Sequence, residues 1–182
     1  TFFALENCLN DQQEIDIKSL FSKLNEINLE FVPNNNVLEL FLNGKNINQE
    51  IREPRVSNNV SIIAKQPEVR DFLLEFQRNL AAKGGVIMDG RDIGTVILPN
   101  ADFKFFVTAS PEERAKRRFL ELQHLGIEAS YEEVYQNLVS RDKIDSERDV
   151  APLKQADDAI LIDNTILNKQ ETIELILSYL AQ

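Results

Sequence analysis

A charged turn bracketed by glycines stands near the middle of this 182-residue chain, directly after a short apolar run. The run at residues 86–88 has no polar alternation, which predicts a parallel strand buried on both faces. Ligands of open α/β sheets bind where strands end, so Arg91 and Asp92 of the turn are candidates for ligand contact. The alternative is an ordinary strand-to-loop junction that carries an exposed ion pair.

Arginine is confined to the central part of the chain, whereas lysine is scattered along it. All ten arginines lie between Arg52 and Arg148, although the formal net charge of the chain is −10. The guanidinium group binds carboxylate and phosphate in a fixed two-pronged geometry, so this distribution indicates a small anionic ligand. The net charge argues against a nucleic-acid backbone or an anionic membrane as partner.

Three of these arginines share one face of a predicted helix. Arg114, Arg117 and Arg118 lie together with a single glutamate, Glu121, at helical spacing. They would repel one another unless an anion lay between them. A set of solvated charges is the alternative.

Two further groups of charged residues lie at positions where a partner of opposite charge would stabilise them. Arg141, Asp145 and Arg148 follow one another at i, i+4 and i+7, so they point the same way. Arg70 lies near the start of a helix predicted from about Pro67, where the helix dipole disfavours a cation. An anionic ligand would offset that cost, and salt-bridged or solvated side chains are the simpler interpretation.

The composition excludes several kinds of site. Cys8 is the only cysteine, which rules out an internal disulfide and a multi-cysteine zinc site. His124 is the only histidine, which argues against histidine-based metal ligation and a Ser-His-Asp triad. No apolar run reaches membrane-spanning length and no signal peptide opens the sequence, so we expect a cytoplasmic location.

Apolar spacing and turn residues predict the elements that carry these charges. Helices are expected near the N-terminus, from Pro67, after the N-cap Ser110, after the capping box Ser130–Glu133, and at Lys169–Leu180. Strands are expected at 103–108 and 160–162, and a small antiparallel meander at 29–47 with turns at 33–36 and 43–44. The predicted class is α/β, with a mainly parallel sheet flanked by helices and a small antiparallel β insertion.

Five short signatures now identify a family. They are Gly90-Arg91-Asp92-Ile93-Gly94-Thr95-Val96, Glu112-Glu113-Arg114-Ala115-Lys116-Arg117-Arg118, Arg141-Asp142 with Asp145 and Arg148, Val150-Ala151-Pro152-Leu153, and Asp157-Asp158-Ala159. In these the chain closely resembles the bacterial cytidylate kinases, which have the P-loop nucleoside monophosphate kinase fold. The resemblance implies transfer of the γ-phosphoryl group of ATP to CMP or dCMP, with Mg²⁺ bridging the donor phosphates. Such transfer depends on positioning and on neutralising spread negative charge, which suits several arginines.

The resemblance also implies how the acceptor nucleotide is bound. Ser61, Arg70 and Asp92 would face the cytosine, whose N4 amino group suits a carboxylate. Arg148 would lie close to the same base or its phosphate. The ribose would be held by Arg141 and Asp145, the carboxylate accepting from its hydroxyl groups.

The resemblance also implies that the catalytic residues, which act on the phosphates, are Arg91, Arg117, Arg118 and Arg148. Arg117 or Arg118 would close over the transferring group from a lid-like region at 114–148, and closure would exclude water. Arg117, Arg118 and Thr165 would contact ATP, Thr165 near the adenine. No side chain is assigned as a metal ligand.

The resemblance divides the chain into a core kinase domain, 1–28 and 48–182, and the β insertion at 29–47. The family's phosphate loop, Gly-x-x-x-x-Gly-Lys-Ser/Thr, is absent, since Gly44-Lys45 has neither the first glycine nor the following hydroxyl. We therefore expect a trimmed kinase that lacks an N-terminal strand, the phosphate loop and a helix, and that is inactive or nearly so.

Two other functions stay open. A nucleotide-binding module would bind CMP without forming CDP from ATP. A kinase for another monophosphate, such as UMP, is the second alternative, because CMP and UMP differ at one position of the base. The resemblance implies a monomer whose partners are small nucleotides.

Overall fold

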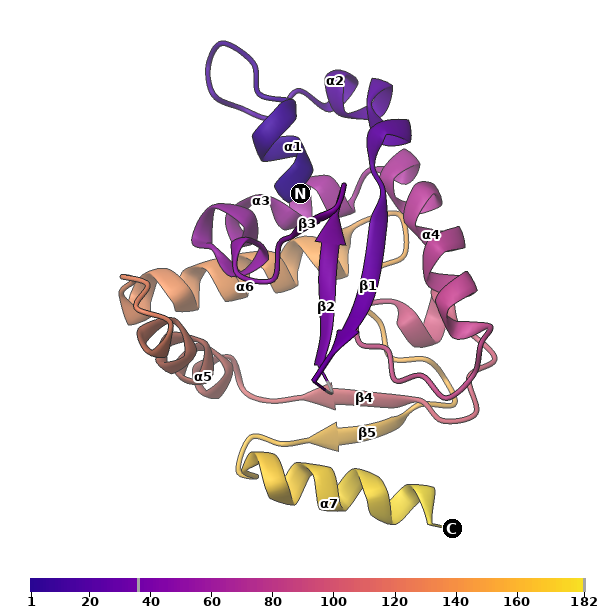
Figure 1. The fold of residues 1–182 in the computed structure, drawn as a ribbon. Helices are drawn as coiled ribbons and strands as arrows, with labels where there is room; N and C mark the ends of the chain where they lie inside the picture. The colour runs from indigo at the N-terminus through magenta and orange to yellow at the C-terminus, as the bar shows by residue number, and fades with distance from the viewer. Residues whose placement is uncertain (36, 182) are drawn as a thin grey trace. The chain divides into compact units, whose positions relative to one another are not determined.

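The computed structural model describes residues 1–35 and 37–181, which form two compact units, Thr1–Phe76 and Gln77–Gln182 (Figure 1). Asn36, part of the turn predicted at 33–36, lies outside the described residues. The helices are α1 (Phe2–Asn7), α2 (Ile17–Ser22), α3 (Pro54–Ala64), α4 (Pro67–Ala81), α5 (Pro111–His124), α6 (Tyr131–Glu147) and α7 (Lys169–Leu180). Short 3₁₀ turns lie at Leu24–Glu26 and Glu50–Arg52, and a π-helical turn at Ile93–Ile97.

The first unit packs its helices around one apolar core. Phe2, Phe3 and Cys8 of the N-terminal segment are buried with Val56 of α3 and Val69 of α4. The helical spacing near the N-terminus and the start of α4 at Pro67 are therefore confirmed. Helix α3 was not predicted, although Pro54 opens it at the first position, where proline's missing N–H costs nothing.

The antiparallel meander predicted at 29–47 is confirmed. It consists of β1 (Leu29–Asn34), β2 (Val37–Leu42) and β3 (Lys45–Asn46), in that order in the sheet. Its register pairs Leu29 with Leu42 and Phe31 with Leu40. The Phe31 ring stacks on Phe76 of α4, with centroids 6.1 Å apart, so this sheet face is fixed within the unit.

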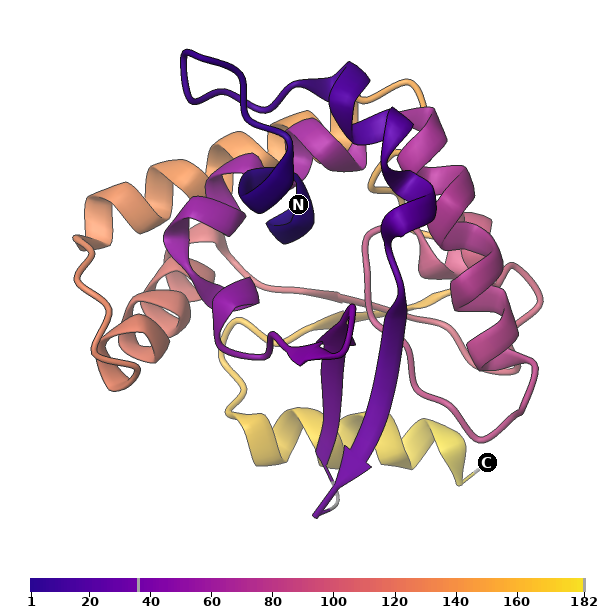
Figure 2. The ribbon, with the colours of Figure 1, turned by 45° about the horizontal axis from the view of Figure 1, so that its top comes forward.

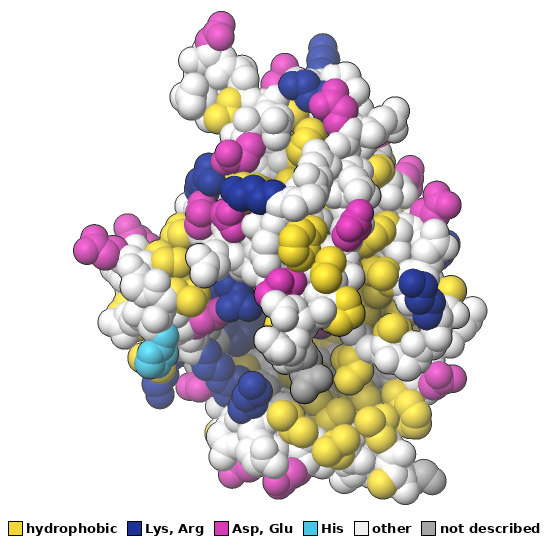
Figure 3. All heavy atoms as spheres, in the orientation of Figure 1, with side chains coloured by type: hydrophobic (Ala, Val, Ile, Leu, Met, Phe, Trp, Pro, Cys, Tyr) yellow, Lys and Arg dark blue, Asp and Glu magenta, His cyan; other side chains and the backbone are white. Residues whose placement is uncertain are grey.

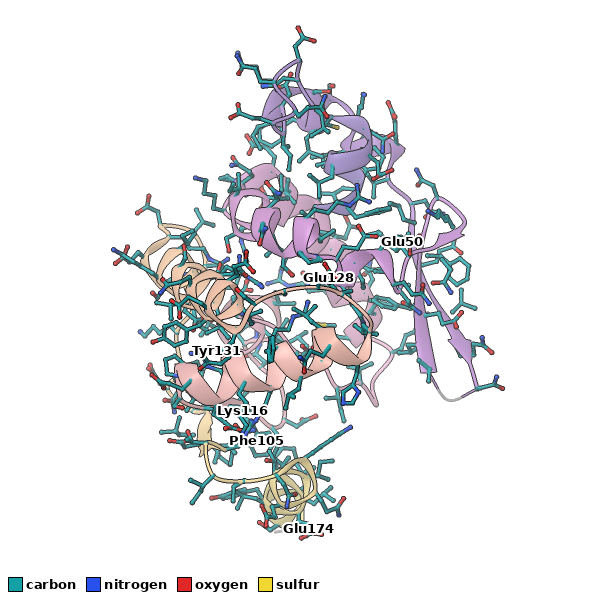
Figure 4. The ribbon with its side chains drawn as sticks, turned by 90° about the vertical axis from the view of Figure 1, so that its left-hand side faces the viewer. Glu50, Phe105, Lys116, Glu128, Tyr131 and Glu174 are labelled. Atoms are coloured by element: carbon teal, nitrogen blue, oxygen red, sulfur yellow. The ribbon has the colours of Figure 1, made fainter. Side chains whose placement is uncertain are left out.

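The second unit contains two parallel strands, β4 (Phe105–Thr108) and β5 (Ile160–Asp163), and helix α7 runs beside β5 (Figures 1 and 2). The Phe105 ring lies 6.1 Å from that of Tyr179 of α7, and Figure 4 labels Phe105 on β4 and Glu174 on α7. The predicted α/β class is confirmed, as are the two strands predicted at 103–108 and 160–162. Strand β4 begins two residues later than expected. The parallel sheet is small, because three of the five described strands are antiparallel.

The strand predicted at 86–88 is wrong. These residues form no ladder, and the side chains of Val86 and Ile87 are exposed, that of Ile87 completely. A buried parallel strand needs a neighbour to pair with, and among the described residues β4 pairs only with β5. Apolar side chains of β4, β5 and α7, including Val107, Leu161 and Leu177, likewise stay exposed. Figure 3 shows hydrophobic side chains gathered on the surface where Figure 1 draws these elements.

Helices α5 and α6 form an antiparallel hairpin, in which Lys116 and Tyr131 mark the two helices in Figure 4. Ser110 caps α5 by accepting from the Glu113 N–H, and Ser130 with Glu133 forms the predicted capping box. The hairpin packs through a small buried cluster and through Tyr131, whose ring meets Phe119 edge-on. Among the described residues, none of the helices combines the length and apolarity needed to cross a bilayer.

Replacing Ser130 with alanine is expected to lower the thermal midpoint by about 2–4 °C at neutral pH, because an N-cap is lost. The Ser130 N–H and hydroxyl both donate to the Glu133 carboxylate, and these bonds hold the pKa of Glu133 below its usual 4.5. A depressed pKa contributes stability above the unfolded value, which is lost as the pH falls through the folded value. Calorimetry should therefore find a smaller difference between variant and parent at about pH 3 than at pH 7; an equal difference would contradict the assignment.

Candidate functional site

Asp92 lies in the second unit, at the start of a π-helical turn. The turn Ile93–Ile97 begins directly after Asp92, whose carbonyl accepts from the N–H groups of Val96 (2.9 Å) and Ile97 (3.2 Å). Turns of this kind are rare and often occur at functional sites. The Asp92 side chain is buried, as expected for a carboxylate with a dedicated partner rather than a solvated one.

That partner is Arg148, which lies between two buried carboxylates. Its Nη2 is 3.8 Å from Asp92 Oδ1, and its Nη1 donates to Asp145 Oδ1 at 3.4 Å. Arg148 Nε donates to the Ala151 carbonyl at 2.7 Å, which fixes the plane of the guanidinium. Asp145 also accepts from Arg91 Nε at 3.3 Å. The structure therefore brings Arg91, Asp92, Asp145 and Arg148 into one network.

Arg141 adds positive charge beside this network. Its Nε is buried and has no hydrogen-bond partner among the described residues. Burial lowers the pKa of the Arg141 guanidinium, and the positive charges of Arg91 and Arg118 lower it further, while Asp145 opposes them. Three guanidinium groups that repel one another around an unsatisfied donor form a site suited to an anion with several oxygens, such as a phosphate.

Each arginine of α5 has a carboxylate partner within the protein, so part of the expected repulsion between them is offset by the chain itself. Arg114 pairs with Asp142 of α6 at 2.5 Å, and Arg118 pairs with Glu121 at 2.8 Å. Arg117 donates to Glu113 at 3.0 Å and reaches out of its helix to Asn164. Asp142 and Asn164 come from distant positions in the sequence, which is why spacing along α5 alone did not reveal them.

Arg117 and Thr165 belong to one loop junction. Arg117 donates to the side chain of Asn164 (3.0 Å) and to the carbonyls of Asn164 (2.8 Å) and Leu167 (3.2 Å). The Thr165 hydroxyl accepts from the Ser110 N–H and donates to Asp163, whose pKa is held below its usual value by these Thr165 contacts. The loop between β5 and α7 is thereby tied to the start of α5.

Ser61 and Arg70 lie in the first unit. Ser61 is 4% exposed, and its hydroxyl has no partner among the described residues, so a polar donor or acceptor is left for a bound group. Arg70 donates to the Ala64 carbonyl at the end of α3. A helix C-terminus attracts a cation, so the partner predicted for Arg70 is supplied at least in part by the protein itself.

Two cations near the π-helical turn escaped the sequence analysis. Arg78 of α4 donates to the carbonyls of Val96 and Ile97. The ammonium group of Lys104, whose side chain is 8% exposed, binds Asp158 and the Pro99 carbonyl. Arginine in the last turn of a helix often binds backbone carbonyls, so the position of Arg78 was a signal for such a role. The sequence spacing did not show that the carbonyls would be those of Val96 and Ile97.

Chelation of a metal by the protein alone finds no support in the part of the chain that is described. No group of three or more histidine, cysteine, aspartate or glutamate side chains is placed to hold an ion there. Mg²⁺ in phosphoryl-transfer enzymes is held largely by substrate phosphates and water.

Comparison with known proteins identifies the family of the chain. The sequence pattern of a protein family described as cytidylate kinase matches residues 1–182. Two cytidylate kinases from different strains of Bacillus cereus are each 45% identical to the chain over 181 residues, covering 98% of it and 78% of each relative. A cytidylate kinase from Bacillus thuringiensis is 44% identical over 180 residues, covering 97% of the chain and 77% of that relative.

Proposed function

The chain belongs to the cytidylate kinase family, whose reaction transfers a phosphoryl group from ATP to CMP or dCMP, and we propose that the network around Arg148 binds the acceptor nucleotide. The observation that carries this proposal is the placement of one buried arginine between two buried carboxylates, beside a second arginine with an unsatisfied donor. Carboxylates can bind the donor groups of base and ribose, and arginines the phosphate. The enclosing fold is that of the P-loop nucleoside monophosphate kinases.

Asp92 is the proposed reader of the base. Cytosine presents an N4 amino donor where uracil presents an O4 acceptor, so a carboxylate at this point favours CMP and repels UMP. By resemblance to the family, Ser61 and Arg70 are proposed to bind the acceptor edge of the cytosine. The buried hydroxyl of Ser61 supports that role, because it has no other described partner.

The ribose and phosphates are assigned to the remaining members of the network. Asp145 can accept hydrogen bonds from ribose hydroxyls, with Arg141 beside it. Arg91, whose side chain is 43% exposed, is proposed to bind phosphate while keeping its contact with Asp145. Arg148 holds the two carboxylates and lies close to the base or phosphate.

The α5–α6 hairpin is proposed to act on the donor side. Arg118 is proposed to bind the transferring phosphoryl group, and its positive charge acts on that of Arg141 of the acceptor-side network. Arg117 and Thr165 are proposed to shape the ATP site through the loop between β5 and α7. Mg²⁺ supplies further charge neutralisation when it arrives with ATP. We also infer a monomer, as the resemblance to the family implies.

Replacing Asp92 with alanine is expected to raise the dissociation constant for CMP about tenfold, because a buried carboxylate no longer accepts from the N4 amino group. The constant for UMP should change much less or fall, since the repulsion of O4 disappears. Isothermal titration of CMP, UMP and ATP with the parent and variant chains measures the three effects.

The matched control is Asp11→Ala, which removes an exposed carboxylate from the first unit. It should leave all three affinities unchanged. Equal losses for CMP, UMP and ATP in Asp92→Ala would contradict a base-reading role. Binding of CMP without formation of CDP from ATP, by a chain that also carries the family's phosphate loop, would instead favour a nucleotide-binding module.

A further inference from the structure

Arg78 lies in the last turn of α4, and its guanidinium group contacts the C-terminal end of the π-helical turn Ile93–Ile97. Its Nε donates to the Ile97 carbonyl at 3.1 Å and its Nη2 to the Val96 carbonyl at 3.0 Å. The carbonyls that end a helical turn have no partner within the turn, so a two-pronged donor at this point satisfies two of them at once.

The same two residues fix the backbone of Asp92. The Val96 and Ile97 N–H groups donate to the Asp92 carbonyl at 2.9 and 3.2 Å. The Val96 carbonyl that accepts from Arg78 and the Ile97 N–H that donates to Asp92 belong to the same peptide unit. A shift of Val96 and Ile97 away from Arg78 would be transmitted directly to the backbone that orients the Asp92 carboxylate.

The opposite side of the turn is packed by Lys104. A Cβ atom at Gly94 would lie 3.2 Å from Lys104 Cδ, so the turn already touches the stem of this lysine. The Lys104 ammonium group is itself held by Asp158 and by the Pro99 carbonyl. Lys104 therefore restrains the turn at Gly94, and Arg78 restrains its C-terminal end through the Val96 and Ile97 carbonyls.

We propose that Arg78 is a positioning residue for acceptor selection: it acts through the π-helical turn to hold Asp92 where it discriminates CMP from UMP. The proposal rests on the proposed function, in which Asp92 reads the base. Arg78 does not touch the nucleotide in this scheme. A binding group must be held to within about half an ångström to be effective, and the relay through Val96 and Ile97 supplies that restraint.

A double-mutant cycle on the full chain tests the relay. Arg78→Met is expected to raise the dissociation constant for CMP about fivefold and that for UMP less than about twofold, measured by titration calorimetry. In the Asp92→Ala background the same change should have no further effect on CMP, since there is no carboxylate left to position. Arg78→Lys, which keeps a cation with several donors, should recover part of the affinity.

The control is Arg55→Met, which also removes an exposed arginine and its side-chain contacts to Glu6, Glu53 and the ring of Phe2 in the first unit. It should leave both affinities unchanged. If Arg78→Met unfolds too readily to titrate, Arg78→Gln, which can still donate to one carbonyl, takes its place.

The outcomes separate the two proposals. If Asp92→Ala leaves CMP affinity unchanged, the proposed base-reading function fails. If Asp92→Ala weakens CMP binding but Arg78→Met has no effect, or has the same effect in both backgrounds, the positioning role of Arg78 is overturned and the base-reading role stands. Equal loss of CMP and UMP affinity in Arg78→Met would also overturn it.

Discussion

Arg148→Met is expected to raise the dissociation constant for CMP by about a hundredfold or more and to lower the free energy of unfolding by about 3 kcal/mol. The Arg148 side chain is 5% exposed and lies between Asp92 and Asp145, which are also buried. Breaking a buried pair by removing one partner leaves an uncompensated charge away from water, which costs more than the pair contributed. Asp145 would keep Arg91, so the larger deficit falls on Asp92.

Denaturant unfolding without ligand and titration with CMP measure the two effects separately. Arg148→Lys is the informative companion, because it keeps the charge but loses the planar fork that reaches Ala151 and Asp145 together. It should recover more stability than CMP affinity. An Arg148→Met chain with the parent's stability and affinity would contradict the central place given to this arginine.

Local patterns predicted the elements of the fold where one side chain or one spacing decides the outcome. The caps at Ser110 and Ser130 and the helix Lys169–Leu180 occur where the sequence placed them, because a cap is chosen by residues three positions apart. The strand expected at 86–88 does not form, because pairing depends on a neighbour that an apolar run does not specify.

The candidate site shows the same division. Arg141, Asp145 and Arg148 were predicted to point one way from their spacing, and Arg148 indeed contacts Asp145 while Arg141 responds to its charge. The contact of Arg148 with Asp92 could not be predicted from the spacing, since 56 positions separate them in the sequence. Contacts between remote segments depend on the packing of the whole unit, which no short window contains.

In a chain that also carries the family's phosphate loop, Arg118→Met is expected to lower kcat by about a thousandfold relative to the same chain with Arg118, while changing the KM for either nucleotide by less than about threefold. An arginine that meets the transferring phosphoryl group stabilises charge that is spread out in the transition state. Loss of such a contact therefore appears in kcat rather than in KM. The positive charge of Arg118 acts on Arg141, which is proposed to lie beside the acceptor nucleotide.

Arg117, its neighbour in the sequence, should behave differently because its donors are engaged by Glu113, Asn164 and Leu167. Arg117→Met is expected to raise the KM for ATP about fivefold, with a smaller change in kcat, and to increase amide hydrogen exchange at residues 164–167. Steady-state kinetics and exchange measured by mass spectrometry give these quantities for both variants.

Lys116→Met, on the same helical turn, is the matched control. Its side chain is 65% exposed and its one described ion pair, with Glu113, spans 4.0 Å, so its removal should alter neither kcat nor exchange. Similar losses of kcat in Arg117→Met and Arg118→Met would contradict the division of labour between the two arginines. A rise in KM alone in Arg118→Met would place Arg118 in ground-state binding, because an interaction made equally in the ground and transition states leaves kcat unchanged.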